Sequence, residues 1–101
     1  MKYGKPYLIV VDKGGILSSF NPKTFHTHLT SANGIYSWWN YLDSTYIVIA
    51  DPLADATSIA EYIRLFIPKR RFFVVAVDIK DHDGFLQKSA WKWIKDHSSV
   101  Y

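Results

Sequence analysis

A chain of 101 residues with an apolar fraction of 49% is long enough for one small domain with its own core, which argues against intrinsic disorder. The absence of cysteine excludes disulfide bonds and thiolate metal sites and fits a reducing cytoplasm, while a net charge of +3 does not by itself indicate nucleic-acid binding. No apolar stretch approaches the roughly 18 residues that cross a membrane. We therefore expect a cytoplasmic protein, without a membrane partner, formed by a single domain over residues 1–101.

The first half of the chain predicts a strand followed by a helix. The strand is Tyr7–Asp12 (YLIVVD), and a pair of glycines two residues later ends it. Asn21 and Pro22 mark the start of the helix, because asparagine caps helices well and proline is favoured in the first turn. Gly34 marks its end, since glycine tolerates the left-handed backbone that follows many helices.

The second half predicts a hairpin, a helix and a further strand. The aromatic run Tyr36–Leu42 and the β-branched run Thr45–Ala50 are separated by two polar residues, which is the pattern of a hairpin. Asp55 can cap a second helix that ends at Pro68. The fourth strand is predicted over Phe72–Ile79.

This order predicts an α+β fold, the ferredoxin-like βαββαβ plait. Right-handed crossovers and a central hairpin lead to an antiparallel sheet in the strand order 4-1-3-2, with both helices on one face. A C-terminal tail follows, with a short strand at residues 85 and 86 and a helix from Ser89. The strands are apolar on both sides, as Leu8 and Ile9 illustrate, so the helix-free face also needs a cover. Because the tail is short, a second protomer is the more economical cover, with the segment Phe85–Ile94 helping to close the face. This predicts a homodimer.

Asp12 is the main candidate for a functional residue. The strands that end at Asp51 and Asp78 run the opposite way to the first strand, so we expect those two aspartates at the other edge of the sheet. Mg²⁺ needs only one or two protein carboxylates when substrate phosphates supply further oxygens, and Asp12 from two protomers meets that requirement. The alternative is that Asp12 is a turn aspartate at the end of a strand.

Basic residues near strand ends are candidate contacts for nucleic-acid phosphates. They are the lysine after the first strand and the only dense basic cluster of the chain: Lys13, Lys69, Arg70 and Arg71. The alternative for the cluster is a solvated connector between the second helix and the fourth strand.

Aromatic and histidine residues give weaker signals. Trp38 and Trp39 alternate to opposite faces of a strand that contains no lysine or arginine, which favours core or interface packing over base stacking. His26 and His28 are two residues apart on the first helix and point to different faces. We therefore expect both histidines on the surface, not paired as metal ligands.

Several segments resemble known families. The opening YLIVVDKG, the helix after it and the hairpin W-x-Y-L-D-S-T-Y-I-V resemble the small ferredoxin-like CRISPR-associated adaptation proteins, and are similar to the virulence-associated protein D ribonucleases. Leu42–Val48 and Gly84–Ile94 resemble the patterns LxSTWxV and G-W-L-x-K-x-A-W-x-W-L of short uncharacterised bacterial and phage proteins labelled the SinR family. This second resemblance covers nearly the whole chain.

The resemblance to the adaptation family implies a homodimeric, metal-dependent nuclease that acts on RNA or DNA. The metal residue of that family is the aspartate that ends the first strand, so the resemblance gives Asp12 the catalytic and Mg²⁺-binding role. This chain differs from the adaptation family in two features. Lys23 is the only lysine or arginine in the first helix, which is arginine-rich in the family, and Val11 stands where the family usually has a tyrosine before the aspartate. The hypothesis from another class is a non-catalytic dimeric adaptor of phage or plasmid origin.

Overall fold

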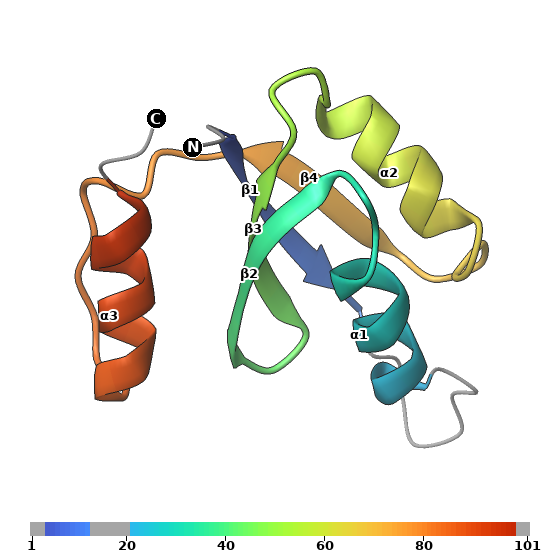
Figure 1. Ribbon diagram of the computed structural model, residues 1–101. Helices are drawn as coiled ribbons and strands as arrows, with labels where there is room; N and C mark the ends of the chain where they lie inside the picture. The colour runs from blue at the N-terminus through green and yellow to red at the C-terminus, as the bar shows by residue number, and fades with distance from the viewer. Residues whose placement is uncertain (1–3, 13–20, 99–101) are drawn as a thin grey trace.

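The computed structural model describes residues 4–12 and 21–98, which form four strands and three helices (Figure 1). In chain order these are β1 (Lys5–Val11), α1 (Pro22–Thr30), β2 (Ile35–Leu42), β3 (Thr45–Ala50), α2 (Ala56–Arg64), β4 (Phe72–Ala76) and α3 (Lys88–His97). The predicted α+β class is confirmed. No helix among the described residues has the length and apolar character needed to span a membrane.

The strands form one antiparallel sheet with β1 and β3 at its centre. The order across the sheet is β2-β3-β1-β4, which reads 4-1-3-2 from the β4 edge. Lys5 lies opposite Ala50 on β3, and Val11 lies opposite Phe72 on β4. The backbone N–H of Val11 also donates to the carbonyl oxygen of Ser44 at 3.0 Å. The C-terminal end of β1 therefore lies beside both the β2–β3 turn and the start of β4.

Local capping explains where α1 and α2 begin. The side-chain oxygen of Asn21 accepts from the backbone N–H groups of Lys23 and Thr24, at 3.0 and 3.2 Å. Asp55 and Ser58 form a reciprocal capping box, in which each side chain bonds the other residue's backbone N–H. The hydrogen bond from the Ser58 backbone lowers the pKa of the Asp55 carboxyl below its ordinary value. Both helix starts are thus fixed by residues visible in the sequence.

The main core lies between the sheet and the helices α1 and α2, which cover the same face (Figure 1). Its buried side chains come from β1, β3, both helices and the segment after α2: Tyr7, Ile9, Val11, Phe25, Leu29, Tyr46, Val48, Ala50, Ile59, Ile63 and Ile67. Removing this much apolar surface from water is the largest favourable contribution to the fold, at about 25 cal/mol per Å².

α3 lies on the other face of the sheet, over the β2–β3 side (Figure 1). Trp39 is buried beneath α3, and its indole N–H donates to the carbonyl oxygen of Ala90 at 3.2 Å. The indole N–H of Trp93 donates to the Ser37 hydroxyl at 3.0 Å. Ile94 completes the contact from the helix side. The tail of the same chain therefore covers part of the face that the sequence predicts to be closed by this tail together with a second protomer.

Two predictions about the C-terminal part are wrong. The fourth strand ends at Ala76 and not at Ile79, because the chain leaves the sheet after the N–H of Val77 bonds the carbonyl oxygen of Pro6 at 3.1 Å. Ile79 is buried instead in the cluster under α3. The short strand predicted at residues 85 and 86 is also absent, since residues 77–87 contain no strand and Phe85 is fully exposed.

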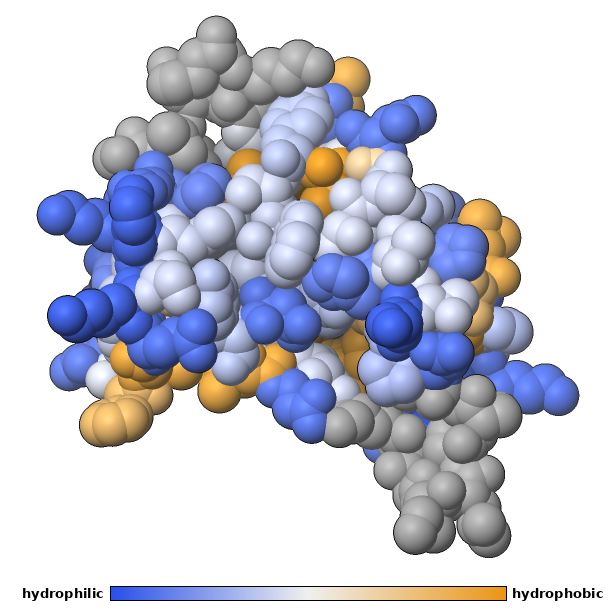
Figure 2. All heavy atoms as spheres, turned by 60° about the horizontal axis from the view of Figure 1, so that its bottom comes forward, coloured by the Kyte–Doolittle hydropathy of each residue, from blue (hydrophilic) through white to orange (hydrophobic). Residues whose placement is uncertain are grey.

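The surface retains hydrophobic side chains. In Figure 2 they form several separate orange groups among hydrophilic residues. The large exposed residues of this kind are Trp38, Tyr41, Leu42, Leu53, Leu65, Phe73, Val75 and Phe85. Single exposed side chains are normal in folded proteins, so only groups that adjoin one another need a structural explanation.

A buried residue of α2 and an exposed residue directly after the helix allow a matched test of stability. Ile63→Ala removes a side chain that is 0% exposed, and we expect the free energy of unfolding to fall by about 2–5 kcal/mol. Leu65→Ala, at a side chain that is 79% exposed, should change it by less than about 0.5 kcal/mol. Urea unfolding followed by circular dichroism measures both, and equal losses would contradict the packing of α2 described above.

Candidate functional site

One end of the sheet gathers most of the predicted site residues. The backbone N–H of Asp12, directly after β1, donates to the carbonyl oxygen of Arg71 at 2.9 Å. Because β1 and β4 are antiparallel neighbours, the basic segment Lys69–Arg71 comes to the end of the sheet where Asp12 lies. Lys13, the fourth predicted basic contact, lies outside the described residues.

Asp12 forms an exposed ion pair with Arg71. The Oδ2 atom of Asp12 and the Nη2 atom of Arg71 are 3.4 Å apart, and the two side chains are 46% and 92% exposed. Exposed pairs of this kind contribute about 0–1 kcal/mol to stability and are screened by salt. The pair can therefore open at little cost to the stability of the fold.

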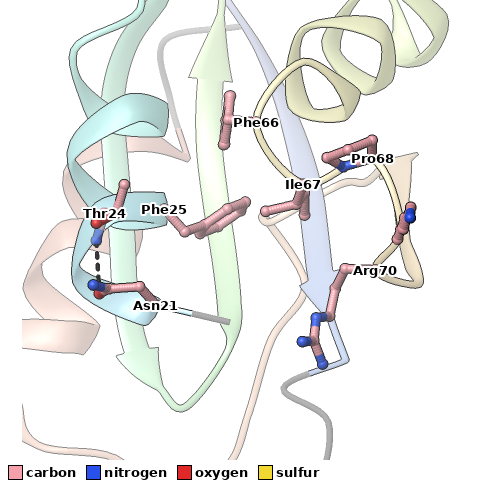
Figure 3. Close-up of a pocket in the computed structure, with 8 residues that line it drawn as sticks. Asn21, Thr24, Phe25, Phe66, Ile67, Pro68 and Arg70 are labelled. Atoms are coloured by element: carbon pink, nitrogen blue, oxygen red, sulfur yellow. Dashed lines mark hydrogen bonds between the residues drawn. The ribbon is translucent and has the colours of Figure 1, made fainter. Parts of the chain in front are cut away.

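A hollow of about 370 Å³ lies between α1 and the segment that joins α2 to β4. Its walls are Asn21, Thr24, Phe25, Phe66, Ile67, Pro68, Lys69 and Arg70. Figure 3 shows Phe25 and Ile67 pointing toward one another, with Arg70 at the level of the C-terminal end of β1. None of these eight residues is acidic and two are cationic, so the hollow favours an anionic ligand.

The other strand-end aspartates lie at the opposite end of the sheet, as predicted. Asp51 follows β3, where it accepts a 2.6 Å hydrogen bond from the Tyr36 hydroxyl and a 2.8 Å bond from the Leu53 N–H. The bond to Asp51 raises the pKa of Tyr36. Asp78 accepts at 2.9 Å from the backbone N–H two residues later. Both carboxylates therefore stabilise turns, and neither joins Asp12.

A metal ion at Asp12 would need ligands from elsewhere. Among residues 4–12 and 21–98, no three histidine, aspartate or glutamate side chains converge in a way that could hold a metal ion. The donor set of one exposed carboxylate fits Mg²⁺ rather than a transition metal, because Mg²⁺ keeps several waters and takes the rest of its oxygens from phosphates. Within the described residues, Asp12 therefore lies outside any cluster of three such ligands.

His26 is half-buried, so the prediction that it lies on the surface holds only in part. Its Nδ1 atom is 2.7 Å from the hydroxyl oxygen of Tyr46, and its ring meets that of Trp38 edge-on, with centroids 4.7 Å apart. His28 is exposed, as expected. The missed signal is the position of His26 three residues before buried Leu29, which is the helical spacing of one face.

Comparison with known proteins gives no match to the chain among family models, curated proteins or solved structures. The resemblances carried by Leu42–Val48 and Gly84–Ile94 therefore stay predictions.

The burial of Tyr46 allows a prediction about the stability of the protein at alkaline pH. Burial raises the pKa of Tyr46 from 10.0 to about 12 in the folded protein. Its contribution to stability is fully present below pH 10 and is lost as the pH rises through 12, because over that interval the unfolded chain loses the proton more readily. We expect the free energy of unfolding of Tyr46→Phe to fall less steeply than that of the wild type over this range.

The control for this titration is Tyr41→Phe, at an exposed position on β2. It should keep the wild-type slope in urea unfolding between pH 9 and 12. Identical slopes for all three proteins would show that Tyr46 does not cause the alkaline loss of stability.

Proposed function

We propose that this protein is a small homodimeric endonuclease that cleaves RNA or DNA with a divalent cation held by Asp12. The observation that carries the proposal is the position of Asp12 at the same end of the sheet as the basic segment Lys69–Arg71. A carboxylate is the ligand that Mg²⁺ prefers, and lysine and arginine are the residues that bind phosphates along a nucleic acid. The two requirements of a phosphodiester-cleaving site therefore meet on one surface.

Each residue has a role in this proposal. Asp12 holds the cation, which when bound lowers the pKa of a coordinated water and neutralises charge on the phosphate. Arg71 leaves its exposed ion pair with Asp12 and binds the phosphate, since a guanidinium matches two phosphate oxygens at once. Lys69 and Arg70, with Lys13 directly after Asp12 in the sequence, bind flanking phosphates.

The fold and location complete the proposal. We assign the domain to the ferredoxin-like plait, followed by the helical tail. The βαββαβ order of β1 to β4 and the antiparallel sheet support this assignment. A cytoplasmic location is supported by the absence of cysteine, which fits a reducing compartment.

The homodimer is supported by the part of the second sheet face that α3 leaves open. Phe73 and Val75 on β4 are 54% and 39% exposed, and they lie opposite Val10 and Leu8 of β1, which are half-buried. Because these four side chains adjoin one another, they form an apolar patch on the sheet. A two-fold interface would cover the patch of both protomers with one set of contacts.

One observation favours the non-catalytic adaptor as a second candidate. The guanidinium of Arg71 lies 3.4 Å from the Asp12 carboxylate and competes with any cation for it. In an adaptor, this ion pair would only hold the end of β1 against the start of β4. The two candidates differ in one measurable property, which is cleavage.

Substitution of Asp12 tests the catalytic role. Asp12→Asn keeps the size of the side chain but loses the charge that holds the cation, so we expect metal-dependent cleavage to fall by about 100-fold or more. The free energy of unfolding should change by less than about 1 kcal/mol, because the Asp12 ion pair is exposed. Cleavage is measured on labelled single-stranded and duplex RNA and DNA with Mg²⁺ or Mn²⁺.

The control for this test is Asp78→Asn, at the other end of the sheet, which should cleave like the wild type. If the wild type cleaves none of the four substrates with either cation, the nuclease proposal is wrong and the adaptor remains.

Substitution of Phe73 tests the homodimer. We expect Phe73→Lys to turn a dimer into a monomer in sedimentation velocity at micromolar concentration, because a lysine ammonium cannot be buried in an apolar interface without a partner. Phe73 is on an edge strand and more than half exposed, so the fold should tolerate the change. Leu53→Lys, at an exposed loop position, should leave the dimer intact.

A monomeric wild type would contradict the homodimer directly. Truncation before Phe85 is a poor substitute for these variants, because it would also uncover Trp39 and the rest of the cluster under α3. Its effect on association could not be separated from the loss of part of the core.

A further inference from the structure

The hollow between α1 and residues 66–70 has the properties of a small-molecule site. Its volume of about 370 Å³ falls in the range of about 300–1,000 Å³ that is typical of ligand pockets. Half-buried Phe66 and exposed Pro68 give it an apolar wall, and Lys69 and Arg70 place positive charge at its edge. An apolar wall beside two cations matches a ligand with a flat ring and an anionic group.

We propose that this hollow binds one unpaired nucleotide of a single-stranded nucleic acid. The base lies against Pro68 and the part of Phe66 left open by His28, which stacks on the Phe66 ring with centroids 4.9 Å apart. Its phosphate binds Lys69 and Arg70. A base in a duplex is stacked and paired and cannot enter, whereas a base in a single strand can turn out toward the protein. The inference rests on the proposed function, since it requires a nucleic-acid partner, and it adds the state of the strand and the place of one nucleotide.

The position of the hollow supports this ligand over an isolated anion. Arg70, on its wall, is followed directly by Arg71, which lies 3.4 Å from Asp12. A strand with one nucleotide in the hollow can therefore continue past Arg71 toward Asp12. Figure 3 shows Arg70 on the side of the hollow where β1 ends.

The start of α1 is not the anion site in this proposal. The Asn21 side chain already accepts from the backbone N–H groups of Lys23 and Thr24, so these two donors of the first turn have a partner. The attraction for a phosphate comes from the lysine and arginine side chains. This assignment makes the proposal testable by changing charge at the hollow without disturbing the cap.

Thr24→Glu is the variant that makes this change. Thr24 is exposed, contributes to the wall of the hollow, and is the third residue of α1, where glutamate is favoured in helices. The variant should therefore fold at least as well as the wild type while it adds a carboxylate to the wall of the hollow that Lys69 and Arg70 also line. Thr27→Glu is the matched control, because it adds the same charge at an exposed position of the same helix outside the hollow.

The measurement is fluorescence anisotropy with labelled 12-nucleotide oligo(dT) and oligo(rU), without divalent cations and with EDTA, so that no cleavage occurs. We expect Thr24→Glu to weaken binding of the single strands by about tenfold or more, and Thr27→Glu by about twofold or less. The wild type should bind a single strand more tightly than a duplex of the same length at the same salt concentration. A loss of affinity in Thr24→Glu with either oligonucleotide supports the proposal. The oligonucleotide that the wild type binds more tightly identifies the preferred sugar.

Three results would overturn the inference: equal losses in the two glutamate variants, tighter binding of the duplex, or no binding of either single strand by the wild type. The inference and the nuclease proposal fail separately. If Thr24→Glu alone loses binding and no protein cleaves, the hollow is a nucleotide site and the nuclease proposal is wrong. If the wild type cleaves and Thr24→Glu binds like Thr27→Glu, the nuclease proposal stands and the hollow is not a nucleotide site.

Discussion

β1 is the constraint on which the rest of the structure depends. It is paired on both edges, with β3 and β4, and its side chains on both faces are apolar. Ile9 on one side is fully buried under α1 and α2, while Leu8 on the other is only half-buried. The chain must therefore cover two faces of one strand with few residues. The same pairing also fixes the site, because the register of Val11 opposite Phe72 carries Asp12 to Arg71.

The C-terminal tail is a partial answer to that constraint. It brings α3 onto the β2–β3 side of the second face. There, buried Trp39 and partly buried Trp93 each donate a hydrogen bond from the indole N–H group. A buried indole without such a partner would be destabilising, so these bonds select one position of the helix. The described part of the tail leaves Phe73 and Val75 on β4 exposed. Under the proposed homodimer, a second chain would cover this open patch.

Prediction from the sequence succeeded where local chemistry decides and failed where distant contacts decide. The β-branched run Thr45–Ala50 and the cap at Asn21 depend on neighbouring residues, and both elements begin where expected. The fourth strand was predicted too long because the apolar residues continue past Ala76, although they pack under α3 instead of extending the sheet. The contact of His26 with Tyr46 joins residues far apart in the chain. The hollow has no sequence pattern at all, since α1 and the α2–β4 connection build it together.

The charges around Asp12 imply that cation and nucleic acid would bind this site together under the proposed function. Alone, the carboxylate has a guanidinium 3.4 Å away, and the positive charge of Arg71 opposes that of an incoming cation. A phosphate that binds Arg71 removes that opposition and also brings oxygens that the cation needs. Each ligand therefore raises the affinity for the other, and the coupling must be equal in both directions. A single carboxylate beside a basic segment is thus a weak cation site without substrate and a stronger one with it, which suits a site that should act only when a strand is bound.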